Sequence, residues 1–130
     1  MKNISNLKIV NCIIEWLTKN AKKHDMYFGD TRIYYYDENN KNHNYVEVSQ
    51  EGQNVKTKFN YDTQPVTAWL EYCNPTGVNL SFENSLYDIV NLTSEFSKYA
   101  KLEEDFTMML DKFKLYYTLG YAWSMSIYEI

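Results

Sequence analysis

Short runs in which apolar and polar residues alternate fill the middle of this chain, and they constrain its fold more than any other feature. The runs cover residues 32–36, 45–49, 55–61, 66–72 and 78–83, and segments rich in Asn, Asp, Gly and Pro separate them. A period of two places successive side chains on opposite faces of a strand. Each run therefore predicts a half-buried β-strand, and the series predicts an antiparallel meander.

Turn residues between the runs predict how neighbouring strands connect. Glu51-Gly52 supplies a turn between two runs, and Asn74-Pro75-Thr76-Gly77 has the residues of a type I turn. We therefore expect residues 66–72 and 78–83 to form a hairpin. Pro65 can stand only at the entrance of its run, because proline donates no hydrogen bond to a sheet.

Helical periodicity occurs on both sides of the meander. Ser5 or Asn6 can cap a first helix that ends near Lys22-Lys23-His24, and Trp16 and Cys12 broaden its apolar face. The stripe that should face the core consists of Leu7, Val10, Ile13, Ile14, Leu17 and Ala21. Ser85 and Asp88 resemble a cap for a short helix, which a polar break at residues 93–98 follows.

A long helix and a last strand are predicted at the C-terminal end of the chain. From Leu102 to Tyr117 apolar residues recur three and four positions apart, and Gly120 is suited to ending a helix. Trp123, Met125 and Ile127 then alternate with small residues. The predicted fold is a single α+β domain over residues 1–130. Its two layers are an antiparallel sheet of about six strands and the helices, with an N-terminal helix and a long C-terminal helix before the last strand.

Composition narrows the functional classes. Aromatic residues make up 17% of the chain and include 13 Tyr, which suit both cores and recognition surfaces. The net charge is -4, and Arg32 is the one arginine, which disfavours general attraction to nucleic acid or anionic membranes. No apolar signal segment or membrane span is evident, so we expect a cytoplasmic protein with Cys12 and Cys73 as free thiols.

Catalytic and metal-binding motifs are not evident in the sequence. His24 and His43 are the two histidines, and both fall in predicted polar connections. No phosphate-binding glycine loop, nucleophile motif or paired metal-ligand spacing is present. Glu103, Glu104 and Asp105 could hold a cation or transfer protons, although an acidic helix start explains them as well. We expect no enzymatic activity, no metal and no cofactor.

One face of the predicted sheet is a candidate binding surface. If Ile33, Val46, Phe59 and their neighbours, with Val66 and Leu70, face the helices, alternation assigns aromatic and charged side chains to the opposite face. The residues expected to contact a partner are Tyr34, Tyr36, Tyr45, Glu47, Lys56, Lys58, Trp69 and Glu71, with Arg32 and Tyr128 on the same face. Aromatic residues of this kind are enriched at protein interfaces. The alternatives are that Tyr and Trp simply suit strands, or that a further helix covers this face.

These observations favour a non-enzymatic protein-binding module, an inhibitor or adaptor that blocks a partner protein such as a nucleic-acid-processing enzyme. Phage or mobile-element counter-defence proteins, for example anti-CRISPR-type inhibitors, and toxin immunity proteins belong to this class. The alternative is a single-stranded nucleic-acid-binding protein, with bases stacked on the aromatic rings and phosphates on Arg32, Lys56 and Lys58. An exposed edge on the last strand would allow a homodimer.

Overall fold

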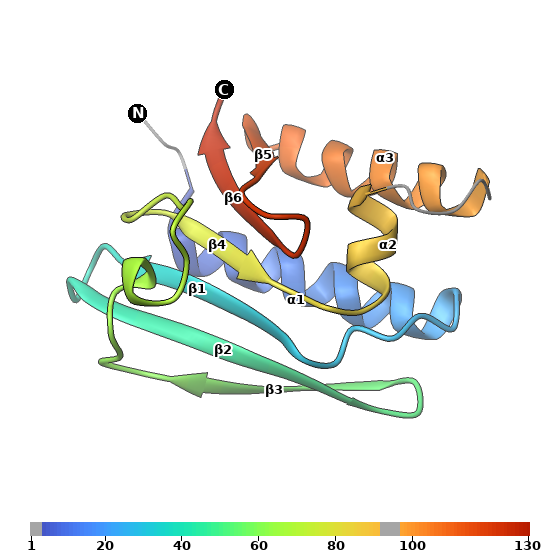
Figure 1. Ribbon diagram of the computed structural model, residues 1–130, viewed down its shortest axis with the longest axis horizontal. Helices are drawn as coiled ribbons and strands as arrows, with labels where there is room; N and C mark the ends of the chain where they lie inside the picture. Colours follow the sequence, from blue (N-terminus) through green and yellow to red (C-terminus); the bar gives the residue numbers. More distant parts are fainter. Residues whose placement is uncertain (1–3, 92–96) are drawn as a thin grey trace.

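The computed structural model describes residues 4–91 and 97–130, which form an α+β fold with one antiparallel sheet (Figure 1). Three α-helices and six strands lie in these residues, and the strands are ordered β3-β2-β1-β4-β6-β5. The helices are α1 Asn6–Lys23, α2 Ser85–Asn91 and α3 Ser97–Asp111. The strands are β1 Thr31–Asp37, β2 Asn42–Glu51, β3 Asn54–Asn60, β4 Val78–Ser81, β5 Leu115–Leu119 and β6 Ser124–Glu129. The predicted α+β class and antiparallel sheet are therefore confirmed.

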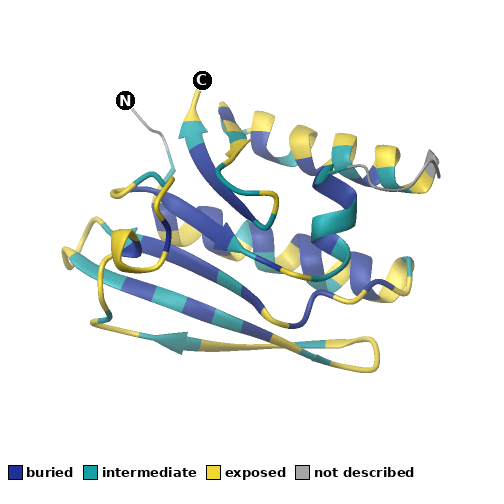
Figure 2. Ribbon diagram, in the orientation of Figure 1, coloured by how far each residue is buried: buried dark blue, intermediate teal, exposed yellow. Residues whose placement is uncertain are grey.

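The main core lies between the sheet and the three helices. Figure 2 shows the alternation of burial along β2, whose buried residues Val46 and Val48 join this core. All three helices contribute fully buried side chains to it, including Ile13, Leu86 and Phe106. The period-two pattern thus placed the apolar side of β1 and β2 correctly.

Helix α1 is present as predicted, but the side of the helix that is buried differs from the predicted apolar stripe. Ser5 is the cap, since its Oγ accepts from the Lys8 amide at 3.2 Å. Leu7, expected in the core, is 41% exposed, whereas Trp16 is buried. Trp16 packs against Phe106 of α3 with ring centroids 5.0 Å apart. The contact with α3, which α1 alone cannot specify, decides which flank is covered.

The strand predicted at residues 66–72 is absent, and the hairpin predicted with residues 78–83 is therefore wrong. Val66–Ala68 forms a 3-10 turn, η1, in which the Trp69 and Leu70 amides both donate to the Val66 carbonyl at 2.9 Å. Strand β4 pairs instead with β1 and β6, so both of its edges are occupied. Apolar residues at 66 and 70 suit a helical turn as well as a strand, and the completed pairing of β4 excluded the strand.

Val66 and Leu70 consequently do not face the helices. Both are buried against Tyr34 on the opposite face of the sheet. The helix-facing positions of the sheet are instead completed by Val78, Met125 and Ile127.

Short helix α2 is capped by Asn84 and not by Ser85. The Leu86 amide donates to Asn84 Oδ1 at 2.9 Å, while Ser85 Oγ accepts from the Tyr27 amide at 3.0 Å. The predicted polar break at 93–98 lies mostly outside the described residues, and α3 already includes its last two positions.

The long C-terminal helix ends earlier than predicted, at Asp111. Lys114 has a positive φ of 60°, and Leu115 then begins strand β5, so Tyr116 and Tyr117 are strand residues. Helical spacing and alternation overlap here, because Leu115, Tyr117 and Leu119 are also two positions apart. Glu103, Glu104 and Asp105 therefore lie within α3, which begins at Ser97, and not in its first turn.

Gly120 belongs to the β5–β6 turn and is not a helix cap. Its amide donates to the Ser124 carbonyl at 3.1 Å, and a Cβ there would lie 2.9 Å from the Tyr72 carbonyl oxygen. The return of β6 places it between β4 and β5, so the last strand has no open edge. The last strand therefore does not offer the exposed edge through which a homodimer was considered, and the edges of the sheet are β3 and β5.

Tyr117 ties β5 to α3 and should show a distinct pH dependence. Its hydroxyl donates to Glu103 Oε1 at 2.8 Å, and burial, reinforced by this carboxylate, raises the pKa of Tyr117 above the ordinary value of 10.0. We expect Tyr117→Phe to lower the free energy of unfolding by about 1.5–3 kcal/mol at pH 7, as for a hydrogen bond to a charged group.

The stabilisation should disappear in alkali. Because the folded pKa of Tyr117 lies above the unfolded one, its contribution is complete below pH 10 and declines above it. The difference between wild type and Tyr117→Phe, measured by urea unfolding at pH 7, 9 and 10.5, should thus shrink at the last pH. Tyr116→Phe, on the exposed side of β5, is the control. A difference that stays constant to pH 10.5 would contradict the assignment.

Candidate protein-binding surface

Residues 61–77 cross the sheet face that lies opposite the helices and build a small second core on it (Figure 1). Leu70 and Val66, 2% and 5% exposed, pack on Tyr34 of β1, which is itself only 5% exposed. Tyr45, Cys73 and Trp123 surround this core and are partly buried. The expected solvent-facing position of Tyr34 is therefore wrong: a loop covers it.

Hydrogen bonds at both ends hold this segment on the sheet. Near its start, the Thr63 amide donates to the His43 carbonyl at 2.8 Å. Near its end, the Asn74 amide donates to Asn79 Oδ1 at 2.7 Å, and Asn79 Nδ2 returns a bond to the Asn74 carbonyl at 2.8 Å. Asn79 is fully buried, so this pairing also satisfies its amide group. The segment is thus a fixed part of the fold.

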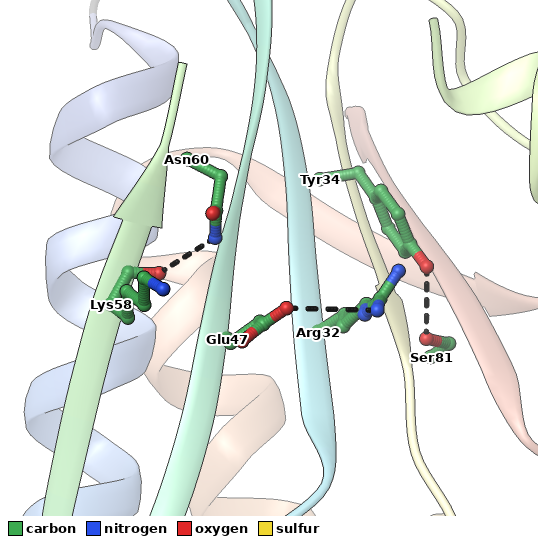
Figure 3. Close-up of polar contacts among 6 residues, drawn as sticks. All are labelled: Arg32, Tyr34, Glu47, Lys58, Asn60 and Ser81. Carbon is green, nitrogen blue, oxygen red and sulfur yellow. Dashed lines mark hydrogen bonds and ion pairs between the residues drawn. The ribbon is translucent and has the colours of Figure 1, made fainter. Parts of the chain in front are cut away.

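Arg32 is the charged centre of the covered face. Its guanidinium lies 3.6 Å from Glu47 Oε1, 4.8 Å from the Tyr45 ring centroid and 5.5 Å from that of Trp69. Figure 3 shows the Arg32–Glu47 pair beside Tyr34, whose hydroxyl lies 3.4 Å from Ser81 Oγ. The side chain of the one arginine is therefore oriented by two rings and a carboxylate.

Trp69 and Tyr72 of the covering segment are exposed and packed against neighbouring rings. Trp69 is 44% exposed and stacks on Tyr34 with ring centroids 6.4 Å apart. Tyr45 packs edge-on against Trp69, with ring centroids 6.3 Å apart. Tyr72 is 56% exposed and packs against Tyr121 at 5.3 Å. Rings held in this way keep one orientation while leaving part of their surface open.

Tyr121 and its neighbours extend the aromatic area onto the β5–β6 turn. The ring of Tyr121 stacks on Trp123 at 4.9 Å, and its hydroxyl donates to Glu71 Oε2 at 2.6 Å. That hydrogen bond to Glu71, followed by desolvation and the carboxylate charge, raises the pKa of Tyr121. We call the combined area the outer aromatic surface; its residues are Arg32, Tyr45, Glu47, Trp69, Glu71, Tyr72, Tyr121 and Trp123.

Carboxylates outnumber cations on and beside the outer aromatic surface. A hollow of about 380 Å³ lies next to Arg32, and Asp30, Glu83 and Trp123 are among its lining residues. Glu47 pairs with Arg32 and lies opposite Lys58 of β3, and Glu71 accepts a hydrogen bond from Tyr121. These four carboxylates exceed the two cations, Arg32 and Lys58, beside them. The local charge is therefore negative, in keeping with the net charge of the whole chain.

The predicted binding residues divide into three groups. Tyr45, Glu47, Trp69 and Glu71 come together in the outer aromatic surface, and Tyr34 lies beneath it. Lys56 and Lys58 lie on edge strand β3, where Lys56 Nζ is 3.3 Å from Glu51 Oε2. Tyr36 packs against His43 at 5.1 Å, and Tyr128 against Tyr116 at 5.8 Å.

Sequence reasoning missed Tyr72, Tyr121 and Trp123. Alternation placed Tyr72 on the same side of its predicted strand as Val66 and Leu70, and Trp123 on the same side of the last strand as Met125, so none of the three was assigned to the outer face. Tyr72 and Trp123 lie in connections, where the period-two pattern does not apply. The turn residues around Pro75 and Gly120 were the available signal that the neighbouring aromatics belong to loops.

The histidines and cysteines lie apart from the outer aromatic surface or serve packing. His24 follows α1, where burial and then the charges of Lys23 and Lys98 lower its pKa. Cys73 borders the second core, and burial raises its pKa; Cys12 lies on α1, on the other side of the sheet. Within residues 4–91 and 97–130, no three His, Cys, Asp or Glu side chains form a group that could hold a metal ion.

The acidic triplet has structural partners. Asp105 accepts a hydrogen bond from Trp16 Nε1 at 2.9 Å. Glu103 accepts one from the Tyr117 hydroxyl at 2.8 Å and one from the Thr107 hydroxyl at 2.9 Å. Two of the three carboxylates therefore hold α3 to α1 and to β5.

Comparison of the chain with protein-family models, with curated proteins and with solved structures gives no match. Among the described residues, no helix is both long and apolar enough to cross a membrane.

Proposed function

We propose that this protein is a non-enzymatic binding module, an inhibitor or adaptor, and that a partner protein docks on its outer aromatic surface. The observation that carries the proposal is the exposure of Trp69 and Tyr72, 44% and 56%, on a segment that the second core holds in place. Trp and Tyr are the residue types that most often dominate the energy of protein interfaces.

Preorganisation supports this role. Trp69 already stacks on Tyr34, and Tyr72 already packs on Tyr121. Ordering flexible side chains opposes association by about 0.5–1.5 kcal/mol each, so rings that are held before binding lose less entropy. Docking on these rings would also remove their exposed apolar area from water.

The charges indicate the chemistry of the partner. The carboxylates around Arg32 favour a basic surface through electrostatic complementarity. A nucleic-acid-processing enzyme presents such a surface where it contacts phosphates. Blocking that surface would inhibit the enzyme without any chemical step in this protein, as counter-defence inhibitors and immunity proteins do.

Single-stranded nucleic acid is the competing ligand for the same face. Stacking on Trp69 and Tyr72 suits bases, but phosphates need cations. Of the three cations expected to meet them, Arg32 and Lys56 are each paired with a carboxylate, and Lys58 lies opposite Glu47. Four carboxylates beside the surface would repel the phosphate backbone. Protein binding is therefore the better supported function.

Replacing Trp69 by alanine should weaken partner binding by at least about 2 kcal/mol, or about 30-fold in Kd, because truncating a central aromatic removes a binding hot spot. The partner would be captured by the tagged protein from a nuclease-treated lysate of its native host. Its Kd would then be measured by calorimetry for wild type, Trp69→Ala and Tyr72→Ala.

Tyr27→Ala is the matched control, since Tyr27 is 47% exposed but lies on the connection between α1 and β1. It should bind the partner like wild type. Equal losses in Tyr27→Ala and Trp69→Ala would reject the outer aromatic surface as the site. Salt-sensitive binding of a labelled oligonucleotide that Trp69→Ala abolishes would favour the nucleic-acid alternative.

A further inference from the structure

A groove runs between α1 and α3 on the helical side of the molecule, away from the outer aromatic surface. It consists of two cavities of about 680 and 320 Å³, which share Lys19, Asp105 and Met108 in their linings. Trp16 closes its base, because the indole packs on Phe106 and donates to Asp105 Oδ2 at 2.9 Å. The two helices are thus in contact at the base of the groove and separated at its open side.

Apolar side chains form much of the groove. Leu102 and Trp16 are buried at its base, and Met109 and Phe113 are partly buried. Met108 is 58% exposed and lines both cavities. Methionine is flexible and polarisable, so it adapts to varied apolar surfaces and is common at peptide-binding sites.

Lysines surround this apolar floor. Lys19, Lys23, Lys98 and Lys101 line the larger cavity, and Lys112 lines the smaller one. In the part of the chain that the structure describes, none of the five lies within 4.0 Å of a carboxylate oxygen. The groove therefore gathers 5 of the 13 basic residues of a chain whose net charge is -4.

Three carboxylates also line the groove, and they do not cancel its positive charge. Asp105 is engaged by the Trp16 indole, while Glu15 and Glu104 lie among five lysines. Burial, and after it the charges of Lys23 and Lys98, lower the pKa of His24, which lines the larger cavity. The groove is thus apolar in its floor and cationic around its rim.

We propose that this groove binds an acidic amphipathic helix of a partner protein, with the apolar side of that helix on Met108, Met109 and Phe113 and its carboxylates on the lysine rim. Laying an amphipathic helix into an apolar groove is a common mode of peptide recognition. Unpaired lysines supply the charge complementarity that selects an acidic helix.

Nucleic acid fits the groove less well than such a helix. Phosphates would meet the lysines, but bases need an exposed ring on which to stack, and Trp16 is only 6% exposed. A helix also matches the length of the groove walls, because the 15 residues of α3 extend about 22 Å.

The groove and the outer aromatic surface lie on opposite sides of the sheet, since α1 and α3 pack on one face and residues 61–77 cover the other. Occupation of one leaves the other open. The protein could therefore hold two partners at once, which distinguishes an adaptor from a simple blocker.

The test is a selection of random 16-residue peptides displayed on phage against the folded full-length protein. Enriched peptides are then synthesised, and their Kd is measured by fluorescence anisotropy on wild type and on Lys19→Glu/Lys101→Glu. Lys8→Glu/Lys41→Glu carries the same change in net charge at two exposed lysines outside the groove and is the control. Amide NMR spectra establish that both variants fold.

Enriched peptides should be rich in Asp and Glu, with apolar residues three and four positions apart, and should bind Lys19→Glu/Lys101→Glu at least about tenfold more weakly. The control variant should lose much less affinity for the same peptides. Absence of enrichment, selection of neutral or basic peptides, or equal losses in both variants would overturn the proposal. Tighter binding of a 16-nucleotide thymidine oligomer than of any peptide, lost in the groove variant, would also overturn it in favour of nucleic acid.

Discussion

Phe106→Ala is expected to lower the free energy of unfolding by about 3–5 kcal/mol, the usual range for removing a buried phenylalanine ring. Phe106 is fully buried and joins three elements. Its ring meets Trp16 of α1 at 5.0 Å and Tyr117 of β5 at 5.8 Å. A cavity at this point would separate α3 from both neighbours. Such a loss is a large fraction of the stability of a small domain, about 5–15 kcal/mol.

Urea unfolding followed by circular dichroism measures this effect. Met108→Ala, two positions along the same helix and 58% exposed, is the matched control and should change stability by less than about 0.5 kcal/mol. If Phe106→Ala lost less than about 1 kcal/mol, the ring could not be what docks α3 on α1 and β5.

Leu70→Ala is expected to detach residues 61–77 from the sheet while the rest of the fold persists. Leu70 is 2% exposed and belongs to a second core in which, among the described residues, Tyr34 and Val66 are the other buried members. Truncating a buried leucine destabilises its surroundings by about 2–5 kcal/mol. A core this small has no further buried side chains to offset that loss, so local opening should precede global unfolding.

Hydrogen exchange at the Trp69 and Leu70 amides reports this opening, since both donate to the Val66 carbonyl. Their protection should fall by about 30-fold or more, whereas amides of β1 and β2 should change little. Thr67→Ala, an exposed change in the same turn, should leave protection as it is. Equal loss of protection in the segment and in the central strands would show that the segment opens only with the whole domain.

Opening of this segment would also remove the proposed site. Trp69 and Tyr72 flank Leu70 in sequence, so their positions depend on its burial. Leu70→Ala should therefore weaken partner binding although Leu70 itself is too buried to contact a partner. A Leu70→Ala protein that binds its partner like wild type would mean that the docked segment is not what recognises it.

The strands that were predicted correctly are those whose pattern allows one interpretation. β1, β2 and β3 follow each other through short turns, and their alternation pairs Ile33 with Val46 and Val46 with Phe59 on the same face. Neighbours in sequence are here neighbours in the sheet. Local pattern and tertiary structure therefore agree.

Two segments were assigned wrongly because their apolar spacing suits two structures. Residues 66–72 have apolar positions both two and four apart, and residues 115–119 continue a helical spacing while they alternate. Strand β4 had both edges occupied by β1 and β6, which left the first segment no partner. Pairing with β6 then drew the second segment into the sheet.

The sequence by itself determined the α+β class, the antiparallel pairing of β1, β2 and β3, the side of β1 and β2 that faces the helices, and the aromatic and acidic composition of the chain. Each of these follows from residue type and local period. Only the tertiary structure decided that residues 61–77 bury Tyr34 while they expose Trp69 and Tyr72, and that five lysines from α1 and α3 gather along one groove. Those arrangements join residues far apart in the chain, and their positions depend on which pairings and packing contacts have the lowest free energy together.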